Sequence, residues 1–370
     1  MKNIALEFIK IIESHNYQAY IVGGFVRDDI MNITSNDIDI TTNATPKEIK
    51  KIFSDVKFKK NVNDEDSYGS TRVIYKNILF EVTTFRKELE YLDNRHPSKI
   101  IYVNDLQTDL KRRDFTINAI CLDKNGEIID PLNGQQDIEK KLIRTINSPN
   151  KSFFDDALRI LRAIRFAITL NFTLDEEIKK AIINNKQYLK NISYERKKVE
   201  LDKMFASVNA KKALELFQEL DLIEVLELEN LERIKDYTDL IGIWSMINSS
   251  NYKFTKHEKD LITNVNLAYE LDNLNPQVLY KYGLYVNILA GINKGLTKKE
   301  ITKAYNDLPI KAKSDINIET IEICNLLNKQ PASFLNQILN QLEIEILNGN
   351  LINDKEAIKE YIIKNYLNEI

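Results

Sequence analysis

The stretch AYIVGGFVRDDIMNITSNDIDIT, residues 19–41, decides the fold that we expect for the first part of this chain. Its first four residues form a short apolar run that ends at two glycines, which is typical of a buried strand entering a tight turn. The backbone amides of such a turn can hold a phosphate group. Arg27 follows at the start of a predicted helix, where a guanidinium can grip a triphosphate through two hydrogen bonds at once. The sequence therefore predicts a strand, a phosphate-binding turn and a helix.

Two carboxylates, Asp37 and Asp39, close this stretch in the run NDIDIT. Alternate side chains of a strand share a face, so both carboxylates project from one face while Ile38 and Ile40 enter the core. Two hard oxygen ligands on a rigid strand suit Mg²⁺, which combines a few carboxylates with substrate phosphates at about 2.0–2.1 Å. The alternative is a solvated strand face, but the neighbouring glycine turn favours metal-assisted nucleotide chemistry.

The composition is that of an ordinary folded protein. With 370 residues, of which 43% are hydrophobic and 29% charged, the chain is long enough for two or more domains. The net charge of −3 argues against nonspecific coating of nucleic acid, so RNA would be held by local basic clusters. Only Cys121 and Cys324 are present, which excludes a disulfide framework and favours the cytoplasm.

The first residues place Ile4, Phe8 and Ile12 on one helical face, so they indicate an amphipathic helix rather than a signal peptide. No apolar run reaches the length that spans a membrane.

The pattern of apolar residues changes along the chain. Up to about residue 145 it alternates between periods of 2 and 3.6, as in a domain that packs helices on an antiparallel or mixed sheet. From Ser152 onward glycine and proline become sparse and helical periodicity dominates. We therefore expect an α+β fold with these parts: a head with a mixed sheet and helices over residues 1–145, then an all-helical neck over 146–205, a body over 206–295 and a tail over 296–370.

Local signals place some elements of the head. The run TPKE, residues 45–48, is a capping box with proline at the first helical position. Residues 72–75 and 78–85 indicate a hairpin, and residues 117–122 followed by Asn125-Gly126 indicate a second one. Within the first hairpin, Glu81 points away from the apolar face, so it is a candidate third carboxylate for a site with two metal ions about 3.5–4 Å apart. The alternative is a surface glutamate on a half-buried strand.

The basic run KRRDFTINA, residues 111–119, begins a predicted strand. An arginine of this run could hold triphosphate oxygens, while Asp114 could accept a hydrogen bond from a ribose hydroxyl and so select ribonucleotides. A solvated charged face is the alternative.

A helix predicted over residues 154–168 carries an unusual set of charges. At 100° per residue Asp155, Arg159 and Arg162 cluster opposite an apolar stripe, with Asp156 and Arg165 on its flanks. The stripe consists of Ala157, Ile160, Leu161, Ile164 and Ile168. A salt-bridged solvent face worth about 0.2–0.5 kcal/mol per pair is the alternative, but three arginines at strict i+3 spacing exceed that need.

An aspartate beside an arginine has a specific chemical use. Cytosine and adenine both present an exocyclic amine next to an unprotonated ring nitrogen, so a carboxylate accepts from the first and a guanidinium donates to the second. Guanine and uracil present a carbonyl and an N–H there. Such mispairing costs a factor of about 10⁴–10⁵ in a site built for hydrogen bonds, so one protein pair could accept C and A alone.

Together these motifs resemble the bacterial class II tRNA nucleotidyltransferases, the CCA-adding family. The matching segments are Gly23-Gly24, Val26-Arg27-Asp28, Asp37-x-Asp39, EVTTFR at 81–86, RRDFTINA at 112–119, Asp130-Pro131 with Gly134, the run from Asp155-Asp156 to Arg165-Phe166, and Ser193 to Lys203. The resemblance covers roughly residues 17–205 and implies that the head over residues 1–145 is a catalytic domain of the polymerase β-like nucleotidyltransferase type. Asp155 stands where the family usually has Glu.

The resemblance implies Mg²⁺ on Asp37 and Asp39. It also implies nucleotide contacts from Gly24, Arg27, Arg113, Asp156, Arg159, Arg162 and Arg165. The implied function is addition of C, C and A to the 3′ end of tRNA from CTP and ATP, with release of pyrophosphate.

Two alternatives stay open at this point. Poly(A) polymerases and A-adding enzymes share the catalytic head, and a noncatalytic RNA-binding protein could reuse the scaffold. The segment YLDNRHP, residues 91–97, resembles the flexible loop of CCA-adding and A-adding enzymes and makes Asp93 and Arg95 further candidates. The loop favours an enzyme able to add the final A. The sequence does not fix the oligomeric state.

Overall fold

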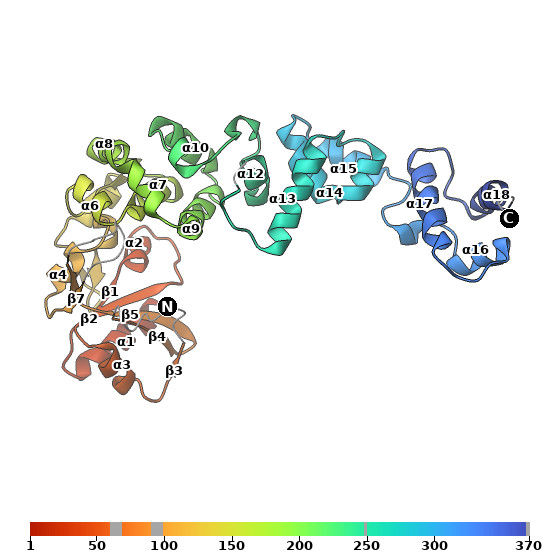
Figure 1. Ribbon diagram of the computed structural model, residues 1–370. Coiled ribbons are helices and arrows are strands. Elements are labelled where there is room, and N and C mark those ends of the chain that lie inside the picture. Colours follow the sequence, from red (N-terminus) through yellow and green to blue (C-terminus); the bar gives the residue numbers. More distant parts are fainter. Residues whose placement is uncertain (60–68, 90–98, 248–249, 368–370) are drawn as a thin grey trace. The chain divides into compact units, whose positions relative to one another are not determined.

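The computed structural model describes residues 1–59, 69–89, 99–247 and 250–367. The candidate loop residues Asp93 and Arg95 lie outside the described residues. The chain forms two compact units, Met1–Glu227 and Leu228–Ile370 (Figure 1). The division into head, neck, body and tail stays a prediction.

The first unit combines strands with helices. Its strands are β1 (Ala19–Val22), β2 (Ile38–Thr42), β3 (Lys57–Phe58), β4 (Ser70–Tyr75), β5 (Ile78–Thr84), β6 (Arg86–Glu88), β7 (Ile100–Tyr102), β8 (Cys121–Leu122), β9 (Ile128–Ile129), β10 (Leu142–Ile143) and β11 (Thr173–Leu174). Its α-helices are α1 (Lys2–Ser14), α2 (Gly24–Ile30), α3 (Pro46–Ile52), α4 (Leu106–Lys111), α5 (Gly134–Glu139), α6 (Pro149–Asp155), α7 (Leu158–Thr169), α8 (Glu176–Asn185), α9 (Tyr194–Phe205), α10 (Ala210–Glu219) and α11 (Ile223–Leu226).

A seven-stranded sheet in the order β3-β4-β5-β2-β1-β8-β9 forms the platform of this unit. β2 and β5 run parallel and their other neighbours in the sheet run antiparallel, so the predicted mixed sheet and the α+β class are confirmed. The predicted first hairpin is confirmed too. Its turn residues Lys76 and Asn77 have φ of 47° and 63°, the conformation that matches the twist of two strands joined by two residues.

The register of β2 on β5 separates the core from the polar face. Ile38 pairs with Phe80 and Asp39 pairs with Glu81, so the apolar partners face one way and the two carboxylates the other. Helix α1 covers the apolar face (Figure 1). There the ring of Phe8 stacks 4.2 Å from that of Phe80 and 4.3 Å from that of Phe53. The predicted amphipathic helix and the capping box at Thr45 are both observed.

The second predicted hairpin is shorter than expected. Residues Thr116–Asn118 form a 3₁₀ turn rather than a strand, and only Cys121–Leu122 pairs with Ile128–Ile129. The physical reason is that Thr116 donates its amide to the carbonyl of Arg144 and its hydroxyl to Asp137. This backbone therefore pairs at an isolated bridge between Phe115 and Thr145 rather than with a strand of the seven-stranded sheet.

The helix predicted over residues 154–168 is two helices, α6 and α7, and that prediction was wrong in its continuity. The residues of its apolar stripe are all buried, as expected. However, Asp156 has extended φ and ψ of −140° and 103° and breaks the helix. Its Oδ1 accepts a hydrogen bond from the amide of Leu158 at 3.1 Å, which favours a new helix start over a continuous turn.

The second unit is helical over its described residues. It contains α12 (Leu240–Met246), α13 (Lys256–Tyr269), α14 (Pro276–Asn293), α15 (Lys298–Asn306), α16 (Thr320–Leu327), α17 (Phe334–Leu347) and α18 (Lys355–Tyr366), with short 3₁₀ turns at Leu231–Arg233 and Lys313–Asp315. A separate core that includes Ile323, Leu342 and Ile358 holds its later helices together.

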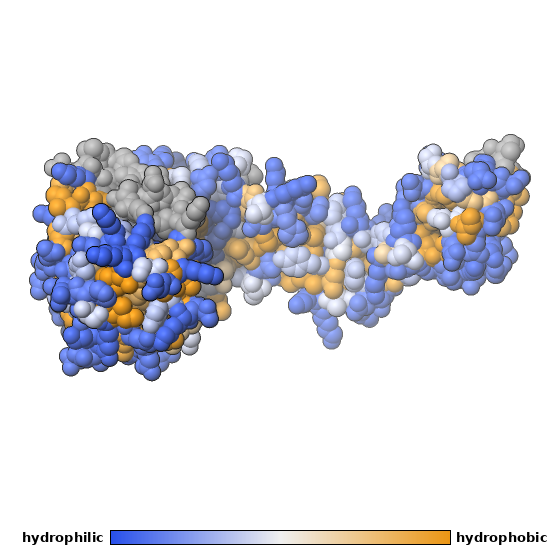
Figure 2. Space-filling view, turned by 90° about the horizontal axis from the view of Figure 1, so that it is seen from below, coloured by the Kyte–Doolittle hydropathy of each residue, from blue (hydrophilic) through white to orange (hydrophobic). Residues whose placement is uncertain are grey.

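The visible face in Figure 2 is largely hydrophilic, with apolar residues showing in patches between polar ones. Among the helices of the described residues, none is both long and apolar enough to cross a bilayer.

We expect Phe8→Ala to destabilise the first unit by about 3–5 kcal/mol, because it removes a fully buried ring that three other rings contact. Urea unfolding monitored by circular dichroism measures the change. Val208→Ala is the control, since Val208 is 102% exposed. Equal loss in both variants would contradict the assignment of the stack as the centre of this core.

Candidate active site

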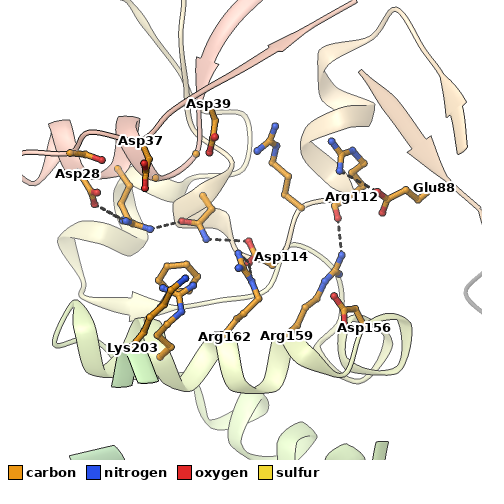
Figure 3. Close-up of a pocket in the computed structure, with 18 of the residues that line it drawn as sticks. Asp28, Asp37, Asp39, Glu88, Arg112, Asp114, Asp156, Arg159, Arg162 and Lys203 are labelled. Atoms are coloured by element: carbon orange, nitrogen blue, oxygen red, sulfur yellow. Dashed lines mark hydrogen bonds and ion pairs between the residues drawn. The ribbon is translucent and has the colours of Figure 1, made fainter. Parts of the chain in front are cut away.

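A cavity of about 630 Å³ opens in the first unit between the glycine turn, the start of β2 and helix α7 (Figure 3). It brings together most of the predicted residues: Gly24, Arg27, Asp37, Asp39, Arg113, Asp114, Asp156, Arg159, Arg162 and Arg165. Figure 3 shows Asp37 and Asp39 on one side and the side chains of α7 on the other. We call this space the active-site cavity.

The turn between β1 and α2 needs its first glycine. Gly23 has φ of 81°, and a Cβ there would lie 3.4 Å from Oδ2 of Asp39. The predicted strand and helix flank this turn, and Gly24 begins α2 at the cavity wall. Because glycine has no Cβ, the turn leaves the space beside the Asp39 carboxylate open to a ligand.

The two predicted carboxylates share this cavity. Neither the Asp37 nor the Asp39 carboxylate has a hydrogen bond or ion pair with any other described residue. Burial, and then the nearby charge of Glu81, raise the pKa of Asp39 to about 6, although Arg113 opposes the shift. A desolvated carboxylate without a cation partner fits a divalent metal.

The described residues contain no group of three or more His, Cys, Asp or Glu side chains that could enclose a metal. Asp37 and Asp39 alone would therefore leave most of the coordination sphere open. That pattern suits a metal which completes its coordination with substrate phosphates and water.

Glu81 does not line the active-site cavity. It lies directly opposite Asp39 in the β2/β5 pair but lines a neighbouring cavity of about 350 Å³. The hydroxyl of Ser70 donates to its carboxylate at 3.3 Å, and Arg72 lies 3.7 Å away. The nearby negative charge of Glu81 raises the pKa of Asp39. The role of Glu81 as a third carboxylate stays a prediction.

A chain of buried polar contacts crosses the floor of the cavity (Figure 3). Arg27 donates to Asp28 at 2.7 Å and to the side-chain oxygen of Asn118 at 2.8 Å. Asn118 donates to Asp114 at 3.1 Å, and Asp114 accepts from Arg162 at 2.8 Å. Sequence reasoning assigned Arg27 and Asp114 to the nucleotide, but both side chains are already engaged within the protein.

The electrostatics of Asp114 follow from these contacts. Its burial would raise the pKa, but Arg162 and the amide of Asn118 outweigh it and lower the pKa to about 2. Asp114 is therefore charged across the physiological range. The role of Asn118 as the link was missed because nothing in the basic run marks it as different from its neighbours.

Asp109 is the main residue that sequence reasoning missed. It is fully buried and accepts hydrogen bonds from Thr41 at 2.9 Å, Arg112 at 2.8 Å and Arg113 at 3.2 Å. Burial opposes its charge, but Arg113 and Arg112 together lower the pKa. Its spacing of three and four residues before the two arginines was a readable signal, since such pairs meet on a helix.

The residues at α7 differ in how they are held. Arg159 donates to the hydroxyl of Ser152 at 3.1 Å and to the carbonyl of Arg112 at 2.9 Å, while Arg165 pairs with Glu200. Burial raises the pKa of Asp156. Its Oδ1 binds the amide of Leu158, and Oδ2 has no partner among the described residues.

An aromatic ring supports the arginines. The guanidinium of Arg165 lies 3.9 Å from the ring centre of Phe166, and those of Arg27 and Arg162 lie 5.2 and 5.5 Å from it. Cations favour the face of an aromatic ring. Asp155 was predicted to lie beside Arg159 and Arg162. It lines a neighbouring cavity together with Arg159, but it does not line the active-site cavity, where Arg162 lies.

Comparisons with protein families cover most of the chain. A family model described as a poly A polymerase head domain matches residues 19–144, and one described as an RNA and SrmB-binding site of polymerase A matches residues 171–232. A model described as tRNA nucleotidyltransferase domain 2 matches residues 249–362.

Whole-length relatives agree with these matches. The chain is 34% identical to a CCA-adding enzyme of a Geobacillus species over 97% of its own length and 96% of the relative. It is 35% identical to that of Bacillus licheniformis, with 97% of each chain covered.

Solved structures show the same likeness. The chain is 27% identical to a Bacillus stearothermophilus CCA-adding enzyme in complex with CTP, with a TM-score of 0.79 and 97% and 96% of the two chains covered. The Thermotoga maritima CCA-adding enzyme complexed with tRNA shares the fold at a TM-score of 0.70 and 23% identity, over 98% and 94% of the chains.

We expect Asp39→Asn to stabilise the metal-free protein above pH 6. The folded-state pKa of about 6 exceeds the ordinary value of 3.8, so the folded protein favours the neutral carboxyl and loses stability as pH rises from about 4 to 6. A neutral amide removes that penalty, which a shift of this size puts at about 3 kcal/mol. Denaturant unfolding in EDTA from pH 4 to 8 measures the difference.

The gain should shrink toward zero below about pH 4, where both side chains are neutral. Asp260→Asn, at an exposed position, is the control and should show no such pH dependence. A variant that is no more stable than the native protein at pH 8 would show that burial of the charged Asp39 carboxylate does not lower the free energy of unfolding.

Proposed function

The chain belongs to the CCA-adding enzyme family, and from this premise we propose that its active-site cavity adds C, C and A to the 3′ end of tRNA. CTP and ATP are the substrates and pyrophosphate is released. The observation that carries the proposal is that one cavity holds two carboxylates without cation partners and, across from them, an aspartate beside fixed arginines. The resemblance drawn from the sequence motifs is confirmed at the level of the family.

The family is a metal-dependent one, and Mg²⁺ is the metal that we propose for Asp37 and Asp39. Their carboxylates are hard oxygen ligands, and an incomplete protein cage suits an ion that also binds phosphates. Bound there, Mg²⁺ would neutralise phosphate charge and favour ionisation of the attacking hydroxyl. The raised pKa of Asp39 supports this assignment, because a bound cation would relieve the penalty of the buried charge.

The chain's own residues bind and orient the reactants. The turn at Gly23 and Gly24 presents backbone to the phosphates, and Arg113 lies beside it, held by Asp109. The terminal ribose 3′-hydroxyl attacks the α-phosphate, so a new P–O bond forms as the bond to the β-phosphate breaks. Positioning supplies much of the rate in such a transfer.

Base selection falls to Asp156 and Arg159. Asp156 keeps one carboxylate oxygen without a partner among the described residues, which suits the exocyclic amine of cytosine or adenine. The guanidinium of Arg159 is fixed by Ser152 and Arg112, yet each terminal nitrogen carries a second hydrogen for the ring nitrogen of the base. Donors fixed in advance lose little freedom on binding.

The alternatives are less well supported. A noncatalytic RNA-binding protein has no use for a buried carboxylate with a raised pKa, which costs folding stability. A-adding and poly(A) polymerase activity would share this cavity and are separated by experiment. We propose the cytoplasm as the compartment, on the sequence argument from two cysteines, both of which are free buried thiols.

Incubation with a tRNA transcript that lacks CCA tests the function directly. With Mg²⁺, we expect CTP alone to add two C residues and CTP with ATP to complete CCA, because the selecting pair accepts both bases. Asp39→Ala should abolish every addition, while Asp260→Ala should not. Incorporation of A alone would reassign the protein to A-adding or poly(A) polymerase activity.

We expect Asp156→Ala to lower kcat/KM for CTP and ATP by about 10²–10⁴, because the site loses the carboxylate oxygen that we propose accepts from the exocyclic amine. Discrimination against UTP and GTP should fall with it. Single-nucleotide incorporation with each of the four triphosphates measures both effects. Asp155→Ala is the matched control and should keep the nucleotide preference, since Asp155 lines a different cavity. Identical profiles for the two variants would overturn the role of Asp156.

A further inference from the structure

A second cavity of about 350 Å³ adjoins the active-site cavity, and we call it the side cavity. The two share Glu88, Arg112 and Arg159. In Figure 3, Glu88 and Arg112 lie at the right, and Arg159 lies below them and nearer the centre. The rest of its lining consists of Lys87, Thr108, Lys111, Asn147, Lys151 and Asp155. A ligand that leaves the active-site cavity past Arg159 would therefore enter the side cavity.

The side cavity is strongly basic. Five of its lining residues are cationic and two are acidic. Its arginines already have partners, because Arg112 pairs with Glu88 and Asp109 and Arg159 donates to Ser152. The lysines differ in this respect.

Lys87, Lys111 and Lys151 come from three elements, β6, α4 and α6, and all are exposed. None of their ammonium groups makes a hydrogen bond or an ion pair with another described residue. Asn147 donates to the carbonyl of Lys111 at 3.1 Å, which ties the loop before α6 to the end of α4. Three like charges around one cavity repel each other, and an anion with several charges would relieve that repulsion.

The other neighbouring cavity offers a contrast. It is lined by Asp39 and Glu81 as well as by Arg86, Arg112 and Arg113, and these arginines pair with Glu88 or Asp109. Its acidic residues would repel a phosphate. Of these two spaces, the side cavity is the one suited to a polyanion.

We propose that the side cavity binds the phosphodiester backbone of the tRNA 3′ strand next to its reacting end. The inference rests on the proposed function, since that reaction requires an RNA end and a nucleotide in one cavity. The reacting 3′-hydroxyl must reach the active-site cavity, and the preceding phosphates must lie in an adjoining space.

Lysine suits this strand better than arginine would. Its ammonium is a compact charge on a flexible stem, while arginine binds phosphate through a fixed fork. The growing strand presents different nucleotides at each of three additions, so contacts to the backbone must not depend on the base. The paired arginines contact the incoming nucleotide, and the unpaired lysines bind the phosphates of the RNA strand.

Filter binding of a tRNA transcript that lacks CCA, without nucleotide or metal, tests the inference apart from catalysis. The full-length double variant K111A/K151A should bind about tenfold more weakly at 0.15 M salt. The slope of log Kd against log salt between 50 and 200 mM should fall by about 1–2, as expected for two lost phosphate contacts. KM for CTP should stay within about twofold of the native value.

Two further variants control for charge and folding. K47A/K51A removes the same charge from exposed positions in α3 and should bind tRNA like the native protein. K111R/K151R keeps the charge and should bind tRNA more tightly than K111A/K151A. Circular dichroism establishes that each variant is folded.

Several outcomes would overturn the inference. Unchanged tRNA binding by K111A/K151A would show that the lysines are only solvated. A higher KM for CTP, or weaker inhibition by pyrophosphate, with tRNA binding unchanged would assign the side cavity to those ligands instead. If the native protein binds tRNA through the lysines but adds no nucleotide, the proposed function fails while the RNA surface stands.

Discussion

The site depends on the parallel pairing of β2 with β5, which holds Asp39 opposite Glu81 on one face and Ile38 beside Phe80 on the other. A shift of one residue would turn the carboxylates into the core. The stack of Phe8 between Phe53 and Phe80 opposes that shift, since it fills the apolar side. The hydrophobic core therefore holds two like-charged carboxylates close together, although their repulsion disfavours this. A bound metal ion would reduce that repulsion.

Around these carboxylates, buried charges are paired to fix the arginines in place. Asp114 holds Arg162, Asp109 holds Arg112 and Arg113, and Glu200 holds Arg165. Buried ion pairs add little net stability, but they hold side chains in one orientation. A protein that selects bases without a nucleic-acid template needs such fixed donors. In the side cavity, by contrast, the lysines are exposed and no ion pair fixes them, which suits contacts to a strand that moves between additions.

Many elements of the first unit were predictable because their local sequence patterns show which side chains of a strand or helix are buried. The strand at Ala19–Val22, the turn at Gly23, the capping box at Thr45 and the hairpin at Lys76-Asn77 were read from local patterns. The apolar stripe of α7 was read in the same way. The motif residues were found because reactive side chains cluster in short runs, and ten of the predicted site residues line one cavity.

The sequence by itself determined which side chains are available: the carboxylate pair, the glycine turn, the arginines at i+3 spacing and the apolar faces that position them. Only the tertiary structure decided their partners. Arg27 meets Asn118 across 91 residues of chain, and Arg162 meets Asp114 across 48. It also decided that Asp156 interrupts the helix and that Asp155 and Glu81 face separate cavities. The physical reason is that periodicity reports the burial of a single element, whereas hydrogen bonds and ion pairs depend on how distant elements are brought together.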